Sequence, residues 1–286
     1  MHNNLNTSEW DRIIAPKSNL LNLNFKEVWN YRDLLFLFVK RDFVAFYKQT
    51  ILGPIWFLIQ PLFTMAVYLF VFGNLAGIPT DGIPKPLFYL VGISTWTYFS
   101  DCLLKTSSVF KDNAGIFGKV YFPRLIMPLS MVVSNLVRFG ITFFLLLLAM
   151  AYYLFFTTAT FQPSLYIMAL PWLVILMAAQ GLGLGMIVSS LTTKYRDLAL
   201  LVTFGVQLLM YGTTVVYPLS SLSGTMKTVV SLNPMTGVVE GVRKGLLGTG
   251  TFDINTLLYT TLISFALVFL GIVIFNKVEK DFVDTI

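Results

Sequence analysis

Long apolar runs separated by short polar breaks make up most of the chain after residue 50. Six of these runs have about the 20 residues that an α-helix needs to cross the hydrocarbon core of a membrane. The third and fourth runs are too long for one perpendicular crossing, so those helices are expected to tilt or to project into the cytoplasm. The pattern predicts an all-α membrane protein with six transmembrane helices, at Ile51–Phe72, Leu87–Leu104, Leu129–Phe156, Leu165–Leu191, Leu198–Tyr217 and Ile254–Phe275.

Residues 26–50 are not expected to form a seventh span. Lys40, Arg41 and Asp42 interrupt the segment, and three adjacent charges in hydrocarbon would cost on the order of several kcal/mol. The polar residues mostly recur at helical spacing, which predicts an amphipathic helix in the membrane interface that leads into the first span. A plain membrane anchor without a mechanical role is the alternative. The basic residues assigned to this interface helix are Arg32, Lys40, Arg41 and Lys48.

The distribution of Lys and Arg predicts the orientation. With the N-terminus in the cytoplasm, only Lys85, Lys227, Arg243 and Lys244 fall on outer segments, and Arg138 falls inside a span. All other Lys and Arg residues then lie on cytoplasmic segments, as the positive-inside rule requires. We therefore expect a cytoplasmic N-terminal segment at 1–25, a six-span domain at 51–275 and a cytoplasmic tail at 276–286.

Two segments between spans are expected to be more than simple loops. The cytoplasmic segment 107–124 is long enough for a short helix, and it carries Lys111, Lys119 and Arg124. The outer segment 218–250 is amphipathic, and two short helices dipping back into the outer leaflet, joined at an Asn-Pro break, would satisfy its pattern. Its marked residues are Pro218, Asn233, Pro234, Glu240 and Arg243.

The composition excludes several classes of protein. Of the 286 residues, 56% are hydrophobic and only 12% are charged, which a soluble domain of this length would not show. The net charge of +6 is better explained by membrane lipid than by nucleic acid, because no basic stripe stands apart from the apolar spans. One Cys and one His cannot form an internal disulfide or a Cys/His metal cluster. The sequence contains no ATP-binding loop and no catalytic constellation, so we expect that this chain is not an enzyme and holds no cofactor.

Polar residues inside the spans are the stronger functional signal, because hydrocarbon makes them costly. They recur at helical spacing and could line a wet passage, or they could form hydrogen bonds between helices in a closed bundle. Aromatic residues near them could stack on the apolar faces of sugars. Arg138 either lines the same passage or extends to the cytoplasmic headgroups. The candidates for lining a passage are Trp56, Gln60, Ser94, Tyr98, Asp101, Thr203, Gln207, Tyr211 and Tyr217.

Several segments, taken in order, resemble the membrane permease of bacterial polysaccharide ABC exporters, as in O-antigen, capsule and teichoic-acid export. The resemblance covers nearly the whole chain from about Asn22. Each segment is weakly specific alone, and the ordered set is specific. They are Lys40-Arg41-Asp42 through Gly53-Pro54-Ile55-Trp56 to Gln60-Pro61-Leu62, then Lys119 to Pro123-Arg124, Tyr195-Arg196-Asp197, Tyr217-Pro218, Asn233-Pro234-Met235, Glu240 and Arg243.

The resemblance implies a homodimer in the bacterial inner membrane with a channel between the two copies. Two copies of a separate ATPase, which carry the ATP and Mg, would dock beneath it and touch segment 107–124 and the N-terminal interface helix. The outer helices within 218–250 would form a gate. The substrate implied is a glycan on a polyprenyl-diphosphate lipid, whose diphosphate could be attracted by Arg12, Lys17, Arg32, Lys40 and Arg41, as could anionic lipid.

Two other functions remain open from the sequence. A permease for drugs or small lipids would share the topology, with less need for an aromatic conduit. A membrane-embedded glycosyl- or acyltransferase would need clustered acids or histidines at the membrane surface, which this sequence does not supply.

Overall fold

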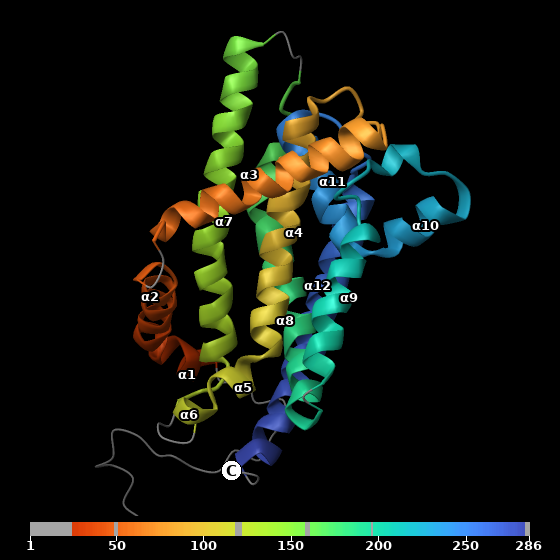
Figure 1. Ribbon diagram of the computed structural model, residues 1–286. Coiled ribbons are helices and arrows are strands. Elements are labelled where there is room, and N and C mark those ends of the chain that lie inside the picture. The colour runs from red at the N-terminus through yellow and green to blue at the C-terminus, as the bar shows by residue number, and fades with distance from the viewer. Residues whose placement is uncertain (1–24, 49–50, 118–121, 158–160, 196, 284–286) are drawn as a thin grey trace, which may run out of the picture.

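The computed structural model describes residues 25–48, 51–117, 122–157, 161–195 and 197–283. Within these ranges the chain is helical and contains no strand. Five helical stretches are long and apolar enough to cross a membrane (Figure 1). They are Gly53–Leu75, Lys85–Ser107, Ile126–Phe156, Leu165–Thr192 and Ile254–Val278.

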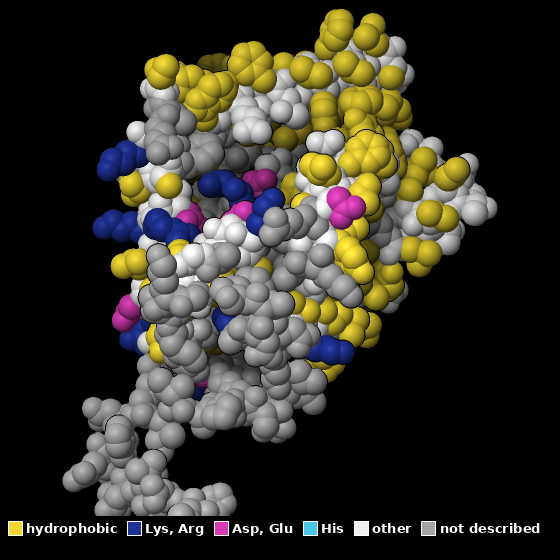
Figure 2. All heavy atoms as spheres, turned by 60° about the horizontal axis from the view of Figure 1, so that its bottom comes forward, with side chains coloured by type: hydrophobic (Ala, Val, Ile, Leu, Met, Phe, Trp, Pro, Cys, Tyr) yellow, Lys and Arg dark blue, Asp and Glu magenta, His cyan; other side chains and the backbone are white. Residues whose placement is uncertain are grey.

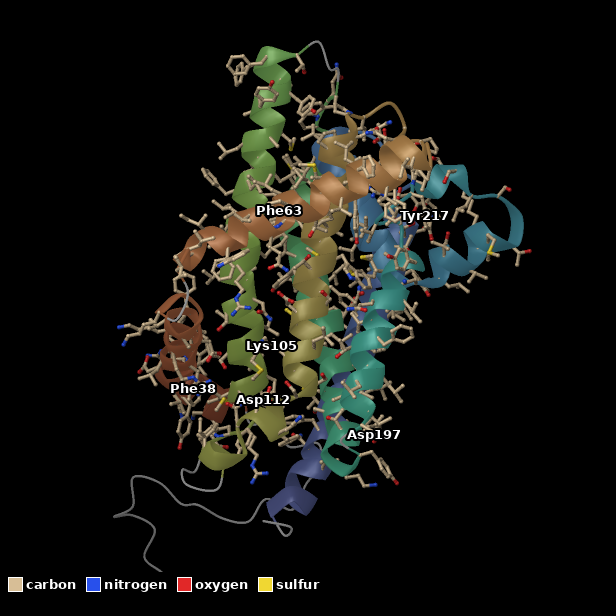
Figure 3. The ribbon with its side chains drawn as sticks, in the orientation of Figure 1. Phe38, Phe63, Lys105, Asp112, Asp197 and Tyr217 are labelled. Atoms are coloured by element: carbon tan, nitrogen blue, oxygen red, sulfur yellow. The ribbon has the colours of Figure 1, made fainter. Side chains whose placement is uncertain are left out.

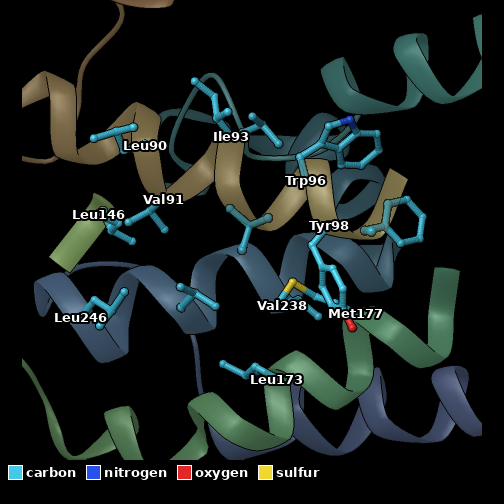
Figure 4. Packing of buried hydrophobic residues seen from close by; sticks show 14 of the residues in the cluster. Leu90, Val91, Ile93, Trp96, Tyr98, Leu146, Leu173, Met177, Val238 and Leu246 are labelled. Carbon is cyan, nitrogen blue, oxygen red and sulfur yellow. The ribbon is translucent and has the colours of Figure 1, made fainter. Parts of the chain in front are cut away.

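Helix α4 (Lys85–Ser107) lies at the centre of the bundle and packs against α7 (Ile126–Phe156) and α8 (Leu170–Lys194). Helix α12 (Ile254–Val283) packs on another side of α8, and the short η4 (Leu165–Ala169) precedes α8. Apolar side chains from α4, α7, α8 and the outer segment fill the core between these helices (Figure 4). Helix α4 is therefore the most buried of the five spans, because several helices pack around it.

Glycines allow α8 to approach two neighbours closely. A Cβ added at Gly181 would lie 2.6 Å from Cys102 Cβ on α4, and one added at Gly183 would lie 2.6 Å from the carbonyl carbon of Leu267 on α12. The glycine run therefore acts in helix packing, as small residues do in membrane bundles.

The first span is composite. It consists of η2 (Gly53–Ile55), α3 (Trp56–Tyr68) and the π-helical η3 (Leu69–Leu75). In Figure 1, α3 crosses the front of α7 and α4 at a slant. The span packs against both of these helices.

The fifth apolar run forms a shorter helix than the sequence predicts. Helix α9 (Leu198–Tyr211) has 14 residues and ends before the expected boundary at Tyr217. At about 1.5 Å per residue it is roughly 21 Å long, less than the thickness of the hydrocarbon core. Residues after Gly212 instead form turns, and side chains from the outer segment bind this part of the backbone.

The segment 26–50 contains two helices in place of one, α1 (Phe25–Asn30) and α2 (Arg32–Lys48). Helix α2 packs against α7, and Phe38 lies 5.8 Å from Phe122, centroid to centroid. The segment 107–124 likewise contains two single-turn helices, α5 (Val109–Asp112) and α6 (Ala114–Phe117), in place of one. Residues 1–24 and 284–286 lie outside the described residues, and α12 continues through residues 276–283 of the expected tail.

The two ends of the bundle differ in character. Helices α1, α5 and α6 lie at one end, near the C-terminal end of α12, whereas η5 (Leu219–Ser221), α10 (Gly224–Leu232) and α11 (Pro234–Leu247) lie toward the other (Figure 1). Turned so that the α5–α6 end comes forward, the surface shows Lys and Arg side chains over α2 and toward the middle (Figure 2). Hydrophobic side chains cover the upper and right-hand parts of this view.

Candidate functional site

The side chain of Asn233 joins the start of α11 to the end of α9. Its Oδ1 accepts a hydrogen bond from Met235 N at 3.0 Å and so caps the first turn of α11. Its Nδ2 donates to Gly212 O at 3.2 Å and to Thr213 Oγ1 at 2.9 Å. Pro234 occupies the first helical position, where its missing N–H costs nothing. The expected break is present, because α10 ends just before Asn233 and α11 begins just after it.

Glu240 and Arg243 form an ion pair inside the protein. Arg243 Nη1 lies 3.1 Å from Glu240 Oε1, and each side chain is 2% exposed. Glu240 also accepts hydrogen bonds from Leu219 N at 3.4 Å and from Thr251 N at 3.0 Å. The carboxylate therefore joins α11 to the chain segments before and after it.

Arg243 joins α11 to α4 and to the turn after α9. Its Nη2 donates to Val215 O at 3.0 Å, and its guanidinium carbon lies 3.7 Å from the centroid of the Phe88 ring. Burial lowers the pKa of Arg243 to about 10, and the charge of Glu240 opposes this shift. Because the pKa stays above neutrality, the guanidinium is charged at pH 7.

The turn that precedes α4 belongs to the same charged cluster. Asp81 has a φ of 51°, a left-handed conformation that Asp tolerates better than most residues. Its Oδ1 accepts a hydrogen bond from Ser220 Oγ at 2.6 Å, and its charge acts on Arg243. Lys85 Nζ donates to Gly73 O within η3, so the end of the first span is tied to the start of α4.

A second charged cluster lies on the helices of the bundle, between α4 and α7. Arg138 on α7 and Lys105 on α4 both act electrostatically on Asp101, and Lys105 is exposed (Figure 3). The guanidinium carbon of Arg138 lies 5.4 Å from the centroid of the Phe57 ring. Arg138 is thus placed against the first span and near Asp101.

The other predicted polar residues of α4 lie inside the chain. Ser94 and Tyr98 are 2% and 3% exposed. Ser94 Oγ donates to Leu90 O of the same helix, and the Tyr98 ring packs 5.0 Å from Phe139, centroid to centroid. Their assignment to a passage stays a prediction, and in this structure neither reaches the surface of the single chain.

The predicted polar residues of the first and fifth runs are exposed. Gln60 lies on the outward surface of α3, and Thr203 and Gln207 lie on the outward surface of α9. Trp56, the first residue of α3, is 41% exposed. These four residues are therefore available to a partner, a lipid or a passage.

Two tyrosines predicted to line a passage meet where α9 ends. Tyr217 Oη donates to the Tyr211 carbonyl oxygen at 2.9 Å, and Tyr211 is 52% exposed (Figure 3). Tyr68 of α3 approaches the same region, where its hydroxyl lies 3.2 Å from the Met210 sulfur. Pro218, which follows these residues, is buried.

The α5–α6 end carries an aromatic cluster that fixes the short helices. Phe110 of α5 stacks on Phe275 of α12 at 4.7 Å between centroids. Arg124 lies over the Phe117 ring at 5.6 Å. Lys111 is exposed beside this cluster, whereas Lys119 lies outside the described residues.

The basic residues of the predicted interface helix lie on α2. Arg41 forms an ion pair with Asp42 at 2.8 Å and lies over the Phe38 ring at 4.9 Å. Arg32 lies 5.6 Å from the Trp29 ring centroid. Lys40 and Lys48 are exposed.

The described residues contain no group of three His, Cys, Asp or Glu side chains that could hold a metal ion. The buried Glu240–Arg243 pair is built into hydrogen bonds and ring contacts with the surrounding chain. What the structure offers chemically is a set of polar and aromatic surfaces on apolar helices, together with a tightly held α11 in the outer segment.

Sequence reasoning missed the partners that hold the outer segment. Glu240 and Arg243 stand one helical turn apart, which signals an ion pair. Nothing local signals that Val215 and Thr251 supply the remaining hydrogen bonds or that Phe88 lies beneath the guanidinium. These contacts depend on how distant segments fold together.

The fold and the site define a polytopic, all-helical integral membrane protein with a folded segment between its last two apolar helices. The profile of the ABC-2 type transporter family matches residues 33–247, and the chain belongs to this family. It is thus a transport permease by family.

Several similar proteins are named for the export of O-antigen or the transport of polysialic acid. The chain is 28% identical over 265 residues to the O-antigen export system permease protein RfbA of Myxococcus xanthus, covering 91% of this chain and 98% of that protein. It is 27% identical over 255 residues to the RfbA protein of Klebsiella pneumoniae, covering 88% and 94%. It is 19% identical over 230 residues to the polysialic acid transport protein KpsM of Escherichia coli, covering 80% and 87%.

Proposed function

We propose that this chain is the permease subunit of an ABC exporter that moves a lipid-linked polysaccharide, of the O-antigen kind, across the bacterial inner membrane. The observation that carries the proposal is the similarity, over nearly the full length of each protein, to permeases named for O-antigen export. The polysialic acid transporter, a more distant relative, also moves a polysaccharide.

In the proposed topology α9 is also a membrane helix, the fifth of six in chain order, and both termini lie in the cytoplasm. A helix of about 21 Å can complete a crossing only together with the turns that follow it. Residues 212–218 supply these turns, and residues 213–216 and Pro218 among them are buried. The gathering of Lys and Arg over α2 supports a cytoplasmic α5–α6 end.

The proposed channel lies between two copies of the chain. Gln60 and Gln207 support it, because they expose amide side chains on helices that are otherwise apolar. Thr203 is exposed beside them, with its hydroxyl bonded to Ala199 O. A polar group facing hydrocarbon is costly, so these surfaces favour a partner or a wet passage. Trp56 and Tyr211 add exposed aromatic faces on which sugar rings can stack.

A separate ATPase is proposed to dock at the α5–α6 end and to supply the energy. The aromatic cluster supports this, because it connects α5 to α12 and so can transmit a push into the bundle. Lys111 and the basic residues of α2 would meet the ATPase or the anionic headgroups. At the other end, residues 218–250 are proposed to dip into the outer leaflet and to gate the channel.

The test of the cargo is a deletion of the gene in its own host, followed by complementation. Cells without the permease should lose surface polysaccharide and accumulate it, linked to lipid, inside. The same cells should show unchanged susceptibility to drugs. Normal surface polysaccharide with altered drug resistance would favour the drug or small-lipid permease instead. Turnover of sugar or acyl donors by the purified chain alone would favour a transferase.

A further inference from the structure

The two helices of the outer segment are held very differently. Every residue of α11 from Met235 to Arg243 is buried, and the helix packs against α4, α8 and α12. In α10, residues 224–229 are exposed and only Val230 is buried. In Figure 1, α10 projects to the side of the bundle, whereas α11 lies against it.

The buried ion pair fixes α11 from three directions. Glu240 holds the chain before α11 through Leu219 N and the chain after it through Thr251 N. Arg243 holds the turn after α9 through Val215 O and lies on a ring of α4. Any displacement of α11 would separate buried charged groups from their partners, which is among the most costly changes inside a protein.

Helix α10 is attached by far less. Its C-terminal end is held by Tyr259, whose hydroxyl donates to Leu232 O at 2.7 Å. Its start is Gly224, at a φ of +58° with no atom within 4 Å of an added Cβ. Its end is followed by Asn233, at a non-helical φ of −72° and ψ of 115°. The helix is therefore bounded at both ends by residues where the backbone direction changes.

We propose that the outer segment is a hinged flap in which α10 moves and α11 stays fixed. The Glu240–Arg243 pair acts as the positioning element that makes α11 part of the wall, and Gly224 and Asn233 act as the hinges. Opening then exposes Val230 and releases the Tyr259 hydroxyl, without separating the buried ion pair. This inference rests on the proposed role of residues 218–250 as an outer gate.

The first test is hydrogen exchange on the full complex, purified with its ATPase and held in lipid nanodiscs. Backbone amides of α10 should exchange about tenfold faster or more than those of α11, because local opening needs few contacts to break. Equal protection of the two helices would overturn the flap.

Two substitutions at Asn233 separate the hinge from the helix cap. Asn233→Asp keeps the oxygen that caps α11 and loses the donor to Gly212 O and Thr213 Oγ1. Because this donor anchors the junction after α10 to the turn after α9, its loss should speed exchange in α10 by about tenfold. Helix α11 should keep its protection, since the Glu240–Arg243 pair holds it independently of Asn233. Asn233→Ala removes the cap as well and should affect the first turn of α11. Loss of protection in both helices of Asn233→Asp would show that they move as one unit, against the proposal.

The ion pair is tested by Arg243→Met, with Arg243→Lys as the conservative variant. Arg243→Met should raise exchange throughout α11, and Arg243→Lys should restore part of the protection. A gate also predicts a greater ion leak in vesicles carrying Asn233→Asp than in vesicles carrying the exposed-site control Lys227→Gln. Equal leak from the two variants would contradict the gating role of α10.

These outcomes are separable from failure of the proposed cargo. A complex that does not export polysaccharide but shows the uneven exchange and the leak would overturn the cargo and support the flap. A complex that exports polysaccharide but exchanges uniformly across both helices would overturn the flap alone.

Discussion

Charged side chains buried in this chain are stabilised by partners from distant segments. Glu240 and Arg243 are adjacent on one helix face, yet their remaining hydrogen bonds come from Leu219, Thr251 and Val215. A sequence shows the charges and their spacing but not these partners. The sequence therefore assigns the pair to the outer segment but does not predict that the pair holds α11 in place.

Removing both members of the pair should cost less stability than the two single removals added together. Arg243→Met leaves the Glu240 carboxylate buried without its cation, and breaking such a pair costs about 3–5 kcal/mol. The double variant Glu240→Gln/Arg243→Met removes both charges and should lose less than the sum of the two single changes. Thermal melting of the three variants in detergent measures this. A simple sum of the single effects would contradict coupling inside the cluster.

The cap of α12 should make stability depend on acid pH. Thr256 donates from its hydroxyl at 2.6 Å and from its backbone N at 2.8 Å to Asp253 Oδ1, and these bonds lower the pKa of Asp253. A lowered pKa gives stabilisation that is complete above the unfolded value of about 4 and is lost as pH falls through the folded value.

Asp253→Asn should remove this contribution to the acid dependence, and Thr256→Val should weaken it. The readout is the melting temperature followed from neutral to acid pH in each variant. An Asp253→Asn protein with the same acid profile as the unchanged protein would show that the cap does not contribute.

At the scale of whole helices, hydropathy predicts where apolar helices occur better than where they end. Four of the expected spans match α4, α7, α8 and α12 within a few residues, apart from the extension of α12 past residue 275. The predicted end of the fifth span at Tyr217 was wrong, because the apolar run continues beyond Gly212 whereas the helix ends and the backbone turns. Asn233 and Arg243 bind that backbone, and hydropathy contains no information on such contacts.

The sequence also could not predict which of the polar residues of α4 face other helices and which face outward. Ser94, Tyr98, Asp101 and Lys105 share one side of a helix, but the neighbouring helices cover them to different extents. The first two residues are therefore buried, and Lys105 is exposed. Deciding this requires the positions of the neighbouring helices.

Because glycines of α8 lie very close to neighbouring helices, the effect of a Gly→Ala substitution on stability should depend strongly on its position. Gly181→Ala would place a Cβ 2.6 Å from Cys102 Cβ, and overpacking of this kind costs about 1–3 kcal/mol. Gly140→Ala on α7 is the matched control, since nothing lies within 4 Å of its added Cβ. That change should raise stability by about 0.5–1 kcal/mol because alanine favours helix. Melting temperatures that fall equally for both would contradict the packing role of Gly181.

Charge reversal on α5 should weaken the attachment of the proposed ATPase. Lys111→Glu changes an exposed residue beside the aromatic cluster, so the bundle should fold and insert normally. Lys277→Glu on α12 is an exposed control at the same end of the molecule. Loss of a rim charge at an interface typically costs about 1 kcal/mol or less, so a severalfold drop in recovered ATPase is expected. Unchanged recovery from Lys111→Glu would place the coupling contact elsewhere.

At the scale of the whole molecule, a membrane bundle with exposed polar and aromatic residues carries the tightly held α11 toward one end and a basic surface toward the other. Each feature fits the export of a long hydrophilic polymer by a permease powered from outside its own chain. The class of the chain follows from its family, whereas the cargo is inferred from the permeases it resembles.

The most direct measurement purifies the tagged protein from its native membrane and assays ATPase activity with and without lipid-linked glycan. We predict that an ATPase subunit is recovered in equal ratio and that its activity rises with lipid-linked polysaccharide but not with the bare polyprenyl lipid. Recovery of the ATPase with stimulation by drugs or small lipids alone would contradict polysaccharide export. Recovery of this chain with no ATPase under gentle detergent conditions would contradict the ATP-driven mechanism itself.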